Sequence, residues 1–270
     1  MVDSIGRGST VDSALQGLQR ASQRTNQTDQ RLATGLKTKG PLDRESDFFN
    51  ASGLSARTTN LAQVKDQVGQ AISTIQAAEA ALDFINQLSD QARAITITAQ
   101  NSVDPAEQAQ LADQFNQIRG QIDNTASDAN FGETNLIGAL PDSMEVALND
   151  DGNLLAVQGT DSSSAGLGIN SRTFSSNSDI QAALSDIESA QSQVRSSSVS
   201  FSSSTSTLLN RITFTDNLTN TLAQGAANLS QTDLNEEAAS LLSLQTRQAL
   251  GSNALTIATA NEQAVLGLFD

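Results

Sequence analysis

The 270-residue chain contains no Cys, His, Trp or Tyr. Without Cys it can form neither disulfides nor thiolate metal sites, and without His it has no imidazole for proton transfer. Most familiar hydrolase and metalloenzyme mechanisms are thereby excluded. No apolar run is long enough to cross a bilayer, so we expect no membrane insertion. Residues 1–36 also lack the apolar core and small-residue cleavage site of a secretory signal peptide, so export would need another route.

Charge is divided unevenly along the chain. The formal net charge is −15, yet residues 1–65 hold nine of the fifteen Lys and Arg against six acids, which gives +3 there and −18 in the remainder. A nucleic-acid-binding protein needs a basic surface that neutralises phosphates, whereas residues 66–270 offer six scattered Arg against 24 acids. We therefore expect no nucleic-acid partner.

Apolar spacing predicts a helix at each end of the chain. Alternating steps of four and three residues run from Val11 to Leu36 and predict a helix over residues 11–36, with an apolar stripe too narrow to be stable alone in water. A matching, incomplete seam runs from Leu241 to Phe269, and Gly251 weakens it. We expect these helices to pair and to need other chains for order. The predicted assembly seam consists of Val11, Leu15, Leu18, Leu32, Leu36, Leu241, Leu244, Leu255, Ala258, Val265 and Phe269.

Two further helices are predicted between the terminal ones. A seam from Leu54 to Ile85 predicts a long helix that ends near Asn101. The sequence Asp104-Pro105-Ala106-Glu107 then predicts a new helix with Asp104 as its N-cap and Glu107 reaching back from the third position.

A third inner helix is predicted from about Asp179 to Leu229. The serine-rich tract Ser196–Ser206 inside it is also typical of a flexible linker. Heptad spacing of Val194, Phe201 and Leu208 through the tract favours the helix.

Residues 130–178 differ in composition from the rest. Gly, Asn, Asp and Ser separate short apolar runs, and Asn149–Asn153 predicts the turn of a β-hairpin. Ca²⁺ binding by this turn is disfavoured because the bidentate Glu of an EF-hand loop is missing. The predicted fold is mainly α: a hairpin rod of long helices, made of a terminal coiled-coil pair and a helical bundle, with a small β-hairpin insert.

No catalytic, cofactor-binding or metal-binding residue is predicted. Adjacent carboxylates such as Glu236 and Glu237 are typical of solvated helix surfaces rather than of a glycosidase pair. Serines in the insert are candidates for O-linked glycosylation if they face solvent, although a soluble serine-rich surface is the favoured interpretation. The candidates are Ser162, Ser163, Ser164, Ser175 and Ser176.

Several segments resemble bacterial flagellins, particularly short alphaproteobacterial ones, and the likeness extends along nearly the whole chain. They are Arg31–Lys37 (RLATGLK), Phe131–Ile137 (FGETNLI), Asp233–Glu237 (DLNEE), Leu244–Gly251 (LQTRQALG) and Val265–Phe269 (VLGLF). A departure occurs at Lys39–Phe49, where the family usually has a link similar to Ser-Ala-Lys-Asp, so the geometry of that link stays open.

The resemblance implies a non-enzymatic structural subunit that self-polymerises into the flagellar filament for motility. It implies a discontinuous inner domain of residues 1–40 and 231–270, and an outer helical rod of residues 41–230 with its β element at about 130–178. It also implies export unfolded through the flagellar type III machinery to the extracellular flagellum. The implied partners are other flagellin subunits, hook–filament junction and cap proteins, and an export chaperone.

Two other functions are weighed against the filament subunit. A hook–filament junction protein would share both terminal signatures, and the Leu244–Gly251 and Val265–Phe269 segments favour flagellin over it. A surface enzyme built on the same scaffold is strongly disfavoured, because the chain has no His and no zinc-binding signature.

Overall fold

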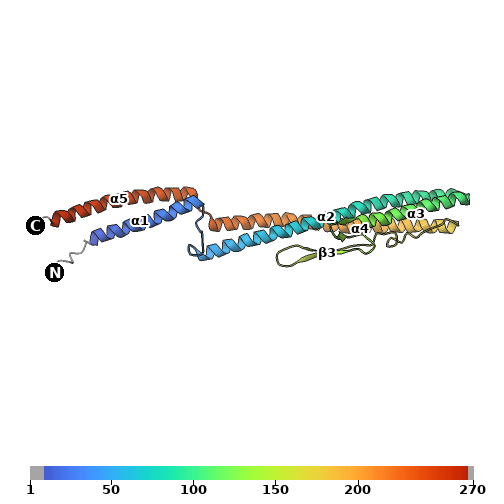
Figure 1. The fold of residues 1–270 in the computed structure, drawn as a ribbon, viewed down its shortest axis with the longest axis horizontal. Helices are drawn as coiled ribbons and strands as arrows, with labels where there is room; N and C mark the ends of the chain where they lie inside the picture. The colour runs from blue at the N-terminus through green and yellow to red at the C-terminus, as the bar shows by residue number, and fades with distance from the viewer. Residues whose placement is uncertain (1–8, 267–270) are drawn as a thin grey trace. The chain divides into compact units, whose positions relative to one another are not determined.

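A computed structural model describes residues 9–266 of the chain, and the fold is mainly α-helical with two small antiparallel strand pairs, as predicted (Figure 1). The helices are α1 (Ser9–Thr34), α2 (Glu45–Asn101), α3 (Pro105–Asp128), α4 (Asn177–Ser230) and α5 (Leu234–Leu266). The strands are β1 (Asn130–Phe131), β2 (Thr134–Asn135), β3 (Ser143–Ala147) and β4 (Leu154–Gln158).

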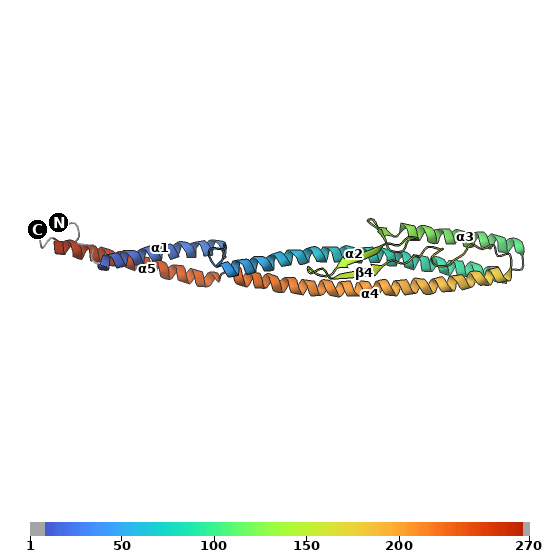
Figure 2. The same cartoon turned by 90° about the horizontal axis from the view of Figure 1, so that it is seen from below.

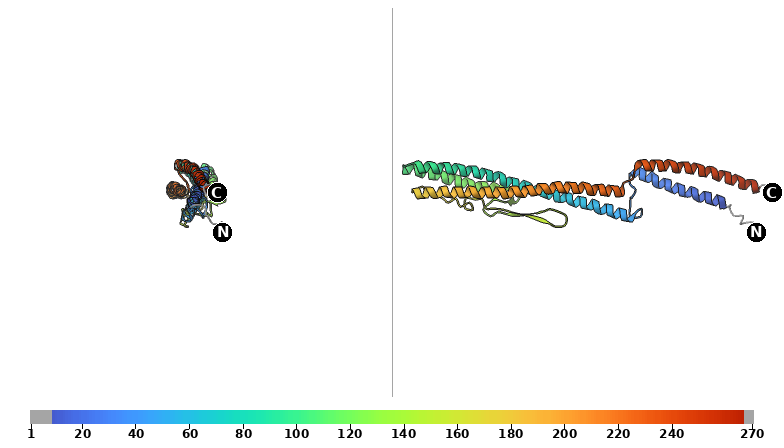
Figure 3. Two further views of the ribbon diagram at one scale, coloured as in Figure 1. Left: turned by 90° about the vertical axis from the view of Figure 1, so that its left-hand side faces the viewer. Right: turned by 180° about the vertical axis from the view of Figure 1, so that it is seen from behind.

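The chain forms two compact units. Unit 1 comprises Met1–Ala56 and Thr221–Asp270, and unit 2 comprises Arg57–Asn220. Unit 1 contains α1 and α5, which lie side by side (Figure 3). Unit 2 contains α3, all four strands and most of α2 and α4.

Helices α2 and α4 run antiparallel through unit 2, and polar side chains fix their register (Figure 2). Two ion pairs and two hydrogen bonds join them: Lys65–Asp216, Glu79–Ser202, Asp90–Gln191 and Arg93–Glu188. Each step toward higher numbers on α2 is matched by an equal step toward lower numbers on α4, as an antiparallel pair requires. Exposed pairs of this kind each contribute little to stability, so their main effect is on alignment.

The serine-rich tract is helical. Helix α4 continues without a break through Ser196–Ser206, and Val194, Phe201 and Leu208 are buried on its inner face. Most of the tract's serines are exposed or half-buried. The heptad of apolar residues therefore decides the local structure, and the helix prediction, rather than the linker alternative, is confirmed.

Helix α3 begins where the sequence predicts. The Asp104 carboxylate accepts a hydrogen bond from the backbone N–H of Ala106 at 2.9 Å, and Pro105 occupies the first turn. Glu107 does not reach back to the backbone of Asp104 but accepts a hydrogen bond from Ser102 Oγ at 2.6 Å. This serine in turn accepts the backbone N–H of Asp104 at 3.2 Å, so it completes the cap in place of the expected direct contact.

The predicted β-hairpin is confirmed, with β3 and β4 paired antiparallel across the Asn149–Asn153 turn. Asn149 Oδ1 accepts backbone N–H groups from Asp151 and Asn153, and Gly152 has a φ of +88°, which favours glycine. Two arginines tie this turn to the helices. Arg57 lies 2.9 Å from Asp150, and Arg211 donates to the carbonyl of Leu148.

The loop after β4 packs tightly against α3, which places three of the candidate glycosylation sites inside the protein. Ser162, Ser163 and Ser164 are all buried. The backbone N–H and Oγ of Ser164 both donate to the Asp123 carboxylate, at 2.8 and 2.9 Å. Modification was expected only for serines that face solvent, so the prediction is wrong for these three. Ser175 and Ser176 are exposed, and their modification stays a prediction.

An ion-pair cluster closes this loop onto the start of α4. The Arg172 guanidinium lies 3.2 Å from Asp179 and 2.5 Å from Asp186. Asp179 also accepts the backbone N–H of Phe174 at 2.8 Å. Phe174 has a φ of 53°, an unfavourable value for a residue with a side chain, and its buried ring packs on Phe115 with a centroid separation of 5.4 Å. The cluster and the ring packing together stabilise this strained conformation.

In unit 1, α1 ends earlier than the sequence predicts. Gly35 adopts a φ of +69° and donates its backbone N–H to the Arg31 carbonyl at 2.7 Å, a left-handed arrangement that ends the helix at Thr34. Leu36 therefore lies outside α1 and forms an antiparallel bridge with Gln231. The expected helical position of Leu36 is wrong, because the glycine before it ends the helix.

The segment after α1 caps the C-terminus of α4. Lys37 Nζ donates to the Asn228 carbonyl at 2.7 Å, and the backbone N–H groups of Lys37 and Thr38 donate to the Ser230 carbonyl. The last carbonyls of a helix lack partners within the helix and carry partial negative charge, so an ammonium group stabilises them. The two helix breaks of unit 1 are therefore joined by hydrogen bonds.

Two glycines of unit 2 provide a test of close packing. A Cβ added at Gly159 would lie 2.2 Å from the Asp142 carbonyl oxygen and 2.8 Å from the Leu136 carbonyl oxygen, whereas one at Gly69 in α2 would meet nothing within 4 Å. We expect Gly159→Ala to destabilise the protein by ~1–3 kcal/mol through strain. Gly69→Ala should stabilise it by ~1 kcal/mol, because Ala favours the helix over Gly. Thermal unfolding followed by circular dichroism measures both, and equal effects of the two changes would contradict this packing.

The Arg172 cluster predicts that stability depends on pH. Burial raises the pKa of Asp179, but hydrogen bonds from the backbone N–H of Thr173 and from Arg172 outweigh burial, and the net pKa is lowered from its ordinary value. A lowered folded-state pKa contributes stability above the unfolded-state pKa, and this contribution disappears as pH falls through the folded-state value. We expect Asp179→Asn to lower the melting temperature at neutral pH. The difference in melting temperature between this variant and the wild type should become smaller in acid.

The matched control for this change is Asp83→Asn, which alters a carboxylate exposed on α2. It should melt at nearly the wild-type temperature at every pH. A deficit of Asp179→Asn that stays constant down to strongly acidic pH would show that the carboxylate's charge is not the source of the stabilisation.

Candidate assembly surface

The expected pairing of the terminal helices is present in unit 1, where α1 packs along α5. Val11 and Leu244 are buried in this pair. Six other predicted seam residues on the two helices are half-buried: Leu15, Leu18, Leu32, Leu241, Leu255 and Ala258. The structure therefore places these seam residues in or beside the α1–α5 contact, while their part in assembly stays a prediction.

Two predicted seam residues are not described. The side chain of Val265 and the whole of Phe269 lie outside the described part of the chain. Half-buried Leu36 borders the helix break instead of the seam.

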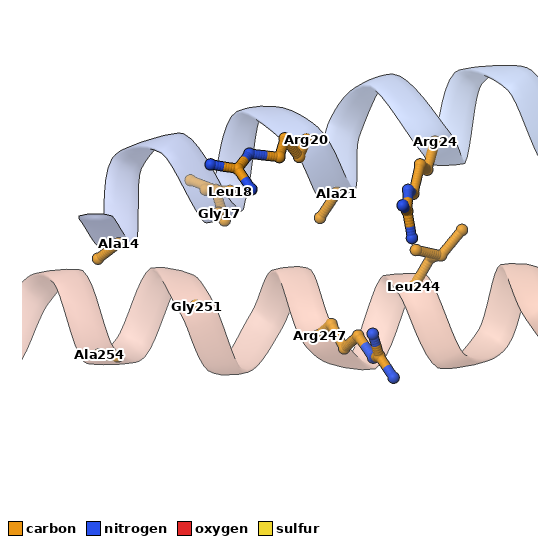
Figure 4. A pocket seen from close by; sticks show the side chains of 10 residues that line it. All are labelled: Ala14, Gly17, Leu18, Arg20, Ala21, Arg24, Leu244, Arg247, Gly251 and Ala254. Atoms are coloured by element: carbon orange, nitrogen blue, oxygen red, sulfur yellow. The ribbon is translucent and has the colours of Figure 1, made fainter. Parts of the chain in front are cut away.

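Gly251 allows a close approach of the two helices. A Cβ built on Gly251 would lie 3.2 Å from Leu18 Cδ1, so the leucine packs directly over the glycine backbone. Figure 4 shows Leu18 on α1 above Gly251 on α5. The glycine that weakens α5 as an isolated helix thus provides space for its partner.

An ion pair fastens the start of α5 to α1. Arg31 lies 3.3 Å from Glu237, which is buried and also accepts a hydrogen bond from Thr232 Oγ1 at 3.1 Å. Asp233 caps the same helix end, accepting the backbone N–H of Asn235 at 2.8 Å. The position of α5 along α1 is therefore fixed where the two helix breaks meet.

Helix α5 carries a second apolar stripe that α1 does not cover. Leu242, Leu250 and Ile257 are 67%, 64% and 63% exposed. They lie eight and seven residues apart, so they share one face of the helix, on the side away from Leu244. The seam predicted from the sequence runs only through Leu244, and this stripe was not predicted, although its spacing is visible in the sequence.

Beside the seam, α1 and α5 form an open groove of about 460 Å³ (Figure 4). Leu18 and Leu244 line it beside five small residues, which are called its floor: Ala14, Gly17, Ala21, Gly251 and Ala254. Arg20 and Arg24 of α1 and Arg247 of α5 line the groove. The sequence analysis did not identify it, because the basic residues come from opposite ends of the chain.

Metal-ligand groups and membrane spans can be checked within the described part of the chain. In residues 9–266, no three His, Cys, Asp or Glu side chains are grouped as metal ligands would be. No helix within the same range is sufficiently long and apolar to cross a membrane. What the surface offers is apolar area and unpaired positive charge, which are suited to binding another protein chain.

Comparison with known proteins agrees with these features. Residues 9–139 match the family described as the bacterial flagellin N-terminal helical region. Flagellin FljO and flagellin FljN of Caulobacter vibrioides are 30% and 31% identical to the chain, and each alignment spans 99% of this chain and 99% of the relative. A flagellin of Brucella melitensis is 25% identical over 98% of this chain and 99% of its own length.

A solved structure shares the fold. The crystal structure of Bacillus cereus flagellin superposes with a TM-score of 0.51 at 17% identity, and the match covers 55% of this chain and 88% of that one. Paired terminal helices, a helical unit with a small β-hairpin, and full-length similarity to the Caulobacter proteins lead to one conclusion. The chain belongs to the bacterial flagellin family.

Proposed function

We propose that this chain is a structural subunit that self-polymerises into the flagellar filament, and that unit 1 supplies the contacts that hold neighbouring subunits together. The observation that carries the proposal is the uncovered stripe of α5. A helix that is apolar on several faces is normally surrounded by protein, yet α1 covers only one face. Neighbouring copies of the same helix pair would cover the rest.

The proposal includes a domain assignment. The inner domain comprises residues 1–40 and 231–270, and the outer domain comprises residues 41–230. The helix breaks support this division, because Gly35 ends α1 and the 231–233 segment separates α4 from α5. Both breaks therefore lie close to the proposed boundaries, which follow residues 40 and 230.

The remaining partners follow from the family. We infer that the subunit is exported by the flagellar type III machinery with the help of a chaperone, and that it joins the extracellular filament between junction and cap proteins. The relatives are named as flagellins, which favours the filament subunit over a hook–filament junction protein. The absence of His and Cys supports a non-enzymatic role.

The test is controlled polymerisation of the purified chain, followed by circular dichroism and electron microscopy of the same samples. Filaments that appear together with a rise in helicity support a subunit whose terminal helices gain order on assembly. A chain that is fully helical and never forms filaments would instead favour a junction protein.

The α5 stripe gives a sharper prediction. We expect Leu250→Asp to leave the monomer soluble and to raise the critical concentration for polymerisation at least tenfold, because burying an unpaired carboxylate between subunits costs several kcal/mol. Gln245→Asp is the matched control, since it adds the same charge at an exposed position on another side of α5. Leu18→Asp and Leu255→Asp should also block filaments, by disrupting the α1–α5 seam. Filament growth by Leu250→Asp at wild-type concentration would exclude the stripe from the subunit contact.

A further inference from the structure

Three arginines beside the groove of α1 and α5 have no carboxylate partner among residues 9–266. Arg20 donates a hydrogen bond to Gln16 Oε1 at 3.3 Å, while Arg24 and Arg247 have no described polar contact. Figure 4 shows Arg24 extending from α1 toward α5 beside Leu244, with Arg247 on α5 nearby. A carboxylate that enters the groove beside Arg24 and Arg247 would be stabilised by their positive charge.

The groove is also sterically prepared for another segment of protein. The Ala and Gly residues of its floor carry no side chain larger than a methyl group, which leaves room beside Leu18 and Leu244 for the side chains of an occupant. An occupant with one carboxylate and exposed apolar side chains would match both the floor and the arginines lining the groove.

The segment Leu42–Phe49 has those properties. Leu42 is 100% exposed and Phe49 is 57% exposed, so both offer apolar surface that a neighbouring chain could cover. The segment contains three acids and one Arg, so its net charge is −2. Among the acids, Asp43 accepts the backbone N–H of Lys39 and Asp47 pairs with Arg44, which leaves Glu45 exposed and without a described partner.

We propose that Leu42–Phe49 of one subunit docks into the arginine groove of a second copy of this chain. Glu45 lies between Arg24 and Arg247 of that copy, and Leu42 and Phe49 cover its floor of small residues. The same chain exposes both the groove and the segment, so each copy can offer one surface to each of two neighbours. Such a head-to-tail contact does not close on itself and continues as an open polymer. The inference rests on the proposed function, because it names a contact within the filament.

The test is a charge exchange. Arg247→Glu and Glu45→Arg should each raise the critical concentration for polymerisation at least tenfold, since each places like charges together at the contact. An equimolar mixture of the two variants should polymerise within about threefold of the wild-type concentration, because every groove then meets a segment of opposite charge. The double variant should be restored in the same way. The matched controls are Arg195→Glu and Glu133→Arg, which alter exposed charges in unit 2 and should polymerise like wild type.

A covalent test uses the absence of native Cys. When filaments form from an equimolar mixture of Arg247→Cys and Glu45→Cys chains, mild oxidation should link the two kinds of subunit as covalent dimers. Each variant polymerised alone should give few dimers, because each groove–segment contact then contains only one cysteine.

The outcomes separate the two proposals. If wild-type chains never polymerise under any condition, the proposed function fails and the docking contact fails with it. If wild-type filaments form but both single reversals polymerise normally, or if the mixture and the double variant remain blocked, only the docking contact is overturned.

Discussion

Helix α5 has more apolar surface than its partner can cover, and the organisation of unit 1 depends on this imbalance. One face packs on α1 through Leu244, and another exposes Leu242, Leu250 and Ile257. Exposed apolar area on this scale is unfavourable for an isolated chain and favourable for one that associates. Under the proposed function, the same feature that leaves the single subunit incomplete would provide the driving force for a polymer.

The imbalance is useful only if α5 is held in a defined position. Arg31 and Glu237 fix its start against α1, and Lys37 with Thr38 caps the end of α4 immediately before it. These contacts are hydrogen-bonded and directional, whereas the seam is mainly apolar. Register is thus set at the helix breaks, and association energy comes from the apolar faces further along.

The sequence predicted the elements that arise from local periodicity. Apolar spacing within short windows predicts the four helices other than α3. Local cap and turn chemistry predicts the Asp104 cap and the hairpin turn at Asn149. It did not predict that Ser162–Ser164 would be buried, because their burial depends on Asp123, about forty positions away in the chain. The end of α1 was missed by two residues, since the apolar seam continues through Leu36 although Gly35 has already ended the helix.

For the candidate surface, too, features within one helix were predictable and features that depend on helix pairing were not. The seam was predictable because each half lies within one helix. The arginine groove was not, because Arg24 and Arg247 come together only when α1 and α5 pair.

In unit 2, the long helices α2 and α4 bury much of their apolar surface within the same chain. Its α2 and α4 bury a continuous apolar core that includes Ile75, Leu82 and Phe201, although other large apolar side chains of these helices stay exposed, and they keep their alignment through pairs such as Lys65 with Asp216. Around the serine tract, α4 buries Phe201 and Leu208 and presents mostly hydroxyls to solvent, with Val199 as an exposed exception. In the proposed filament, unit 2 would have its core before assembly, and α5 of unit 1 would keep an apolar face open until a neighbour covers it.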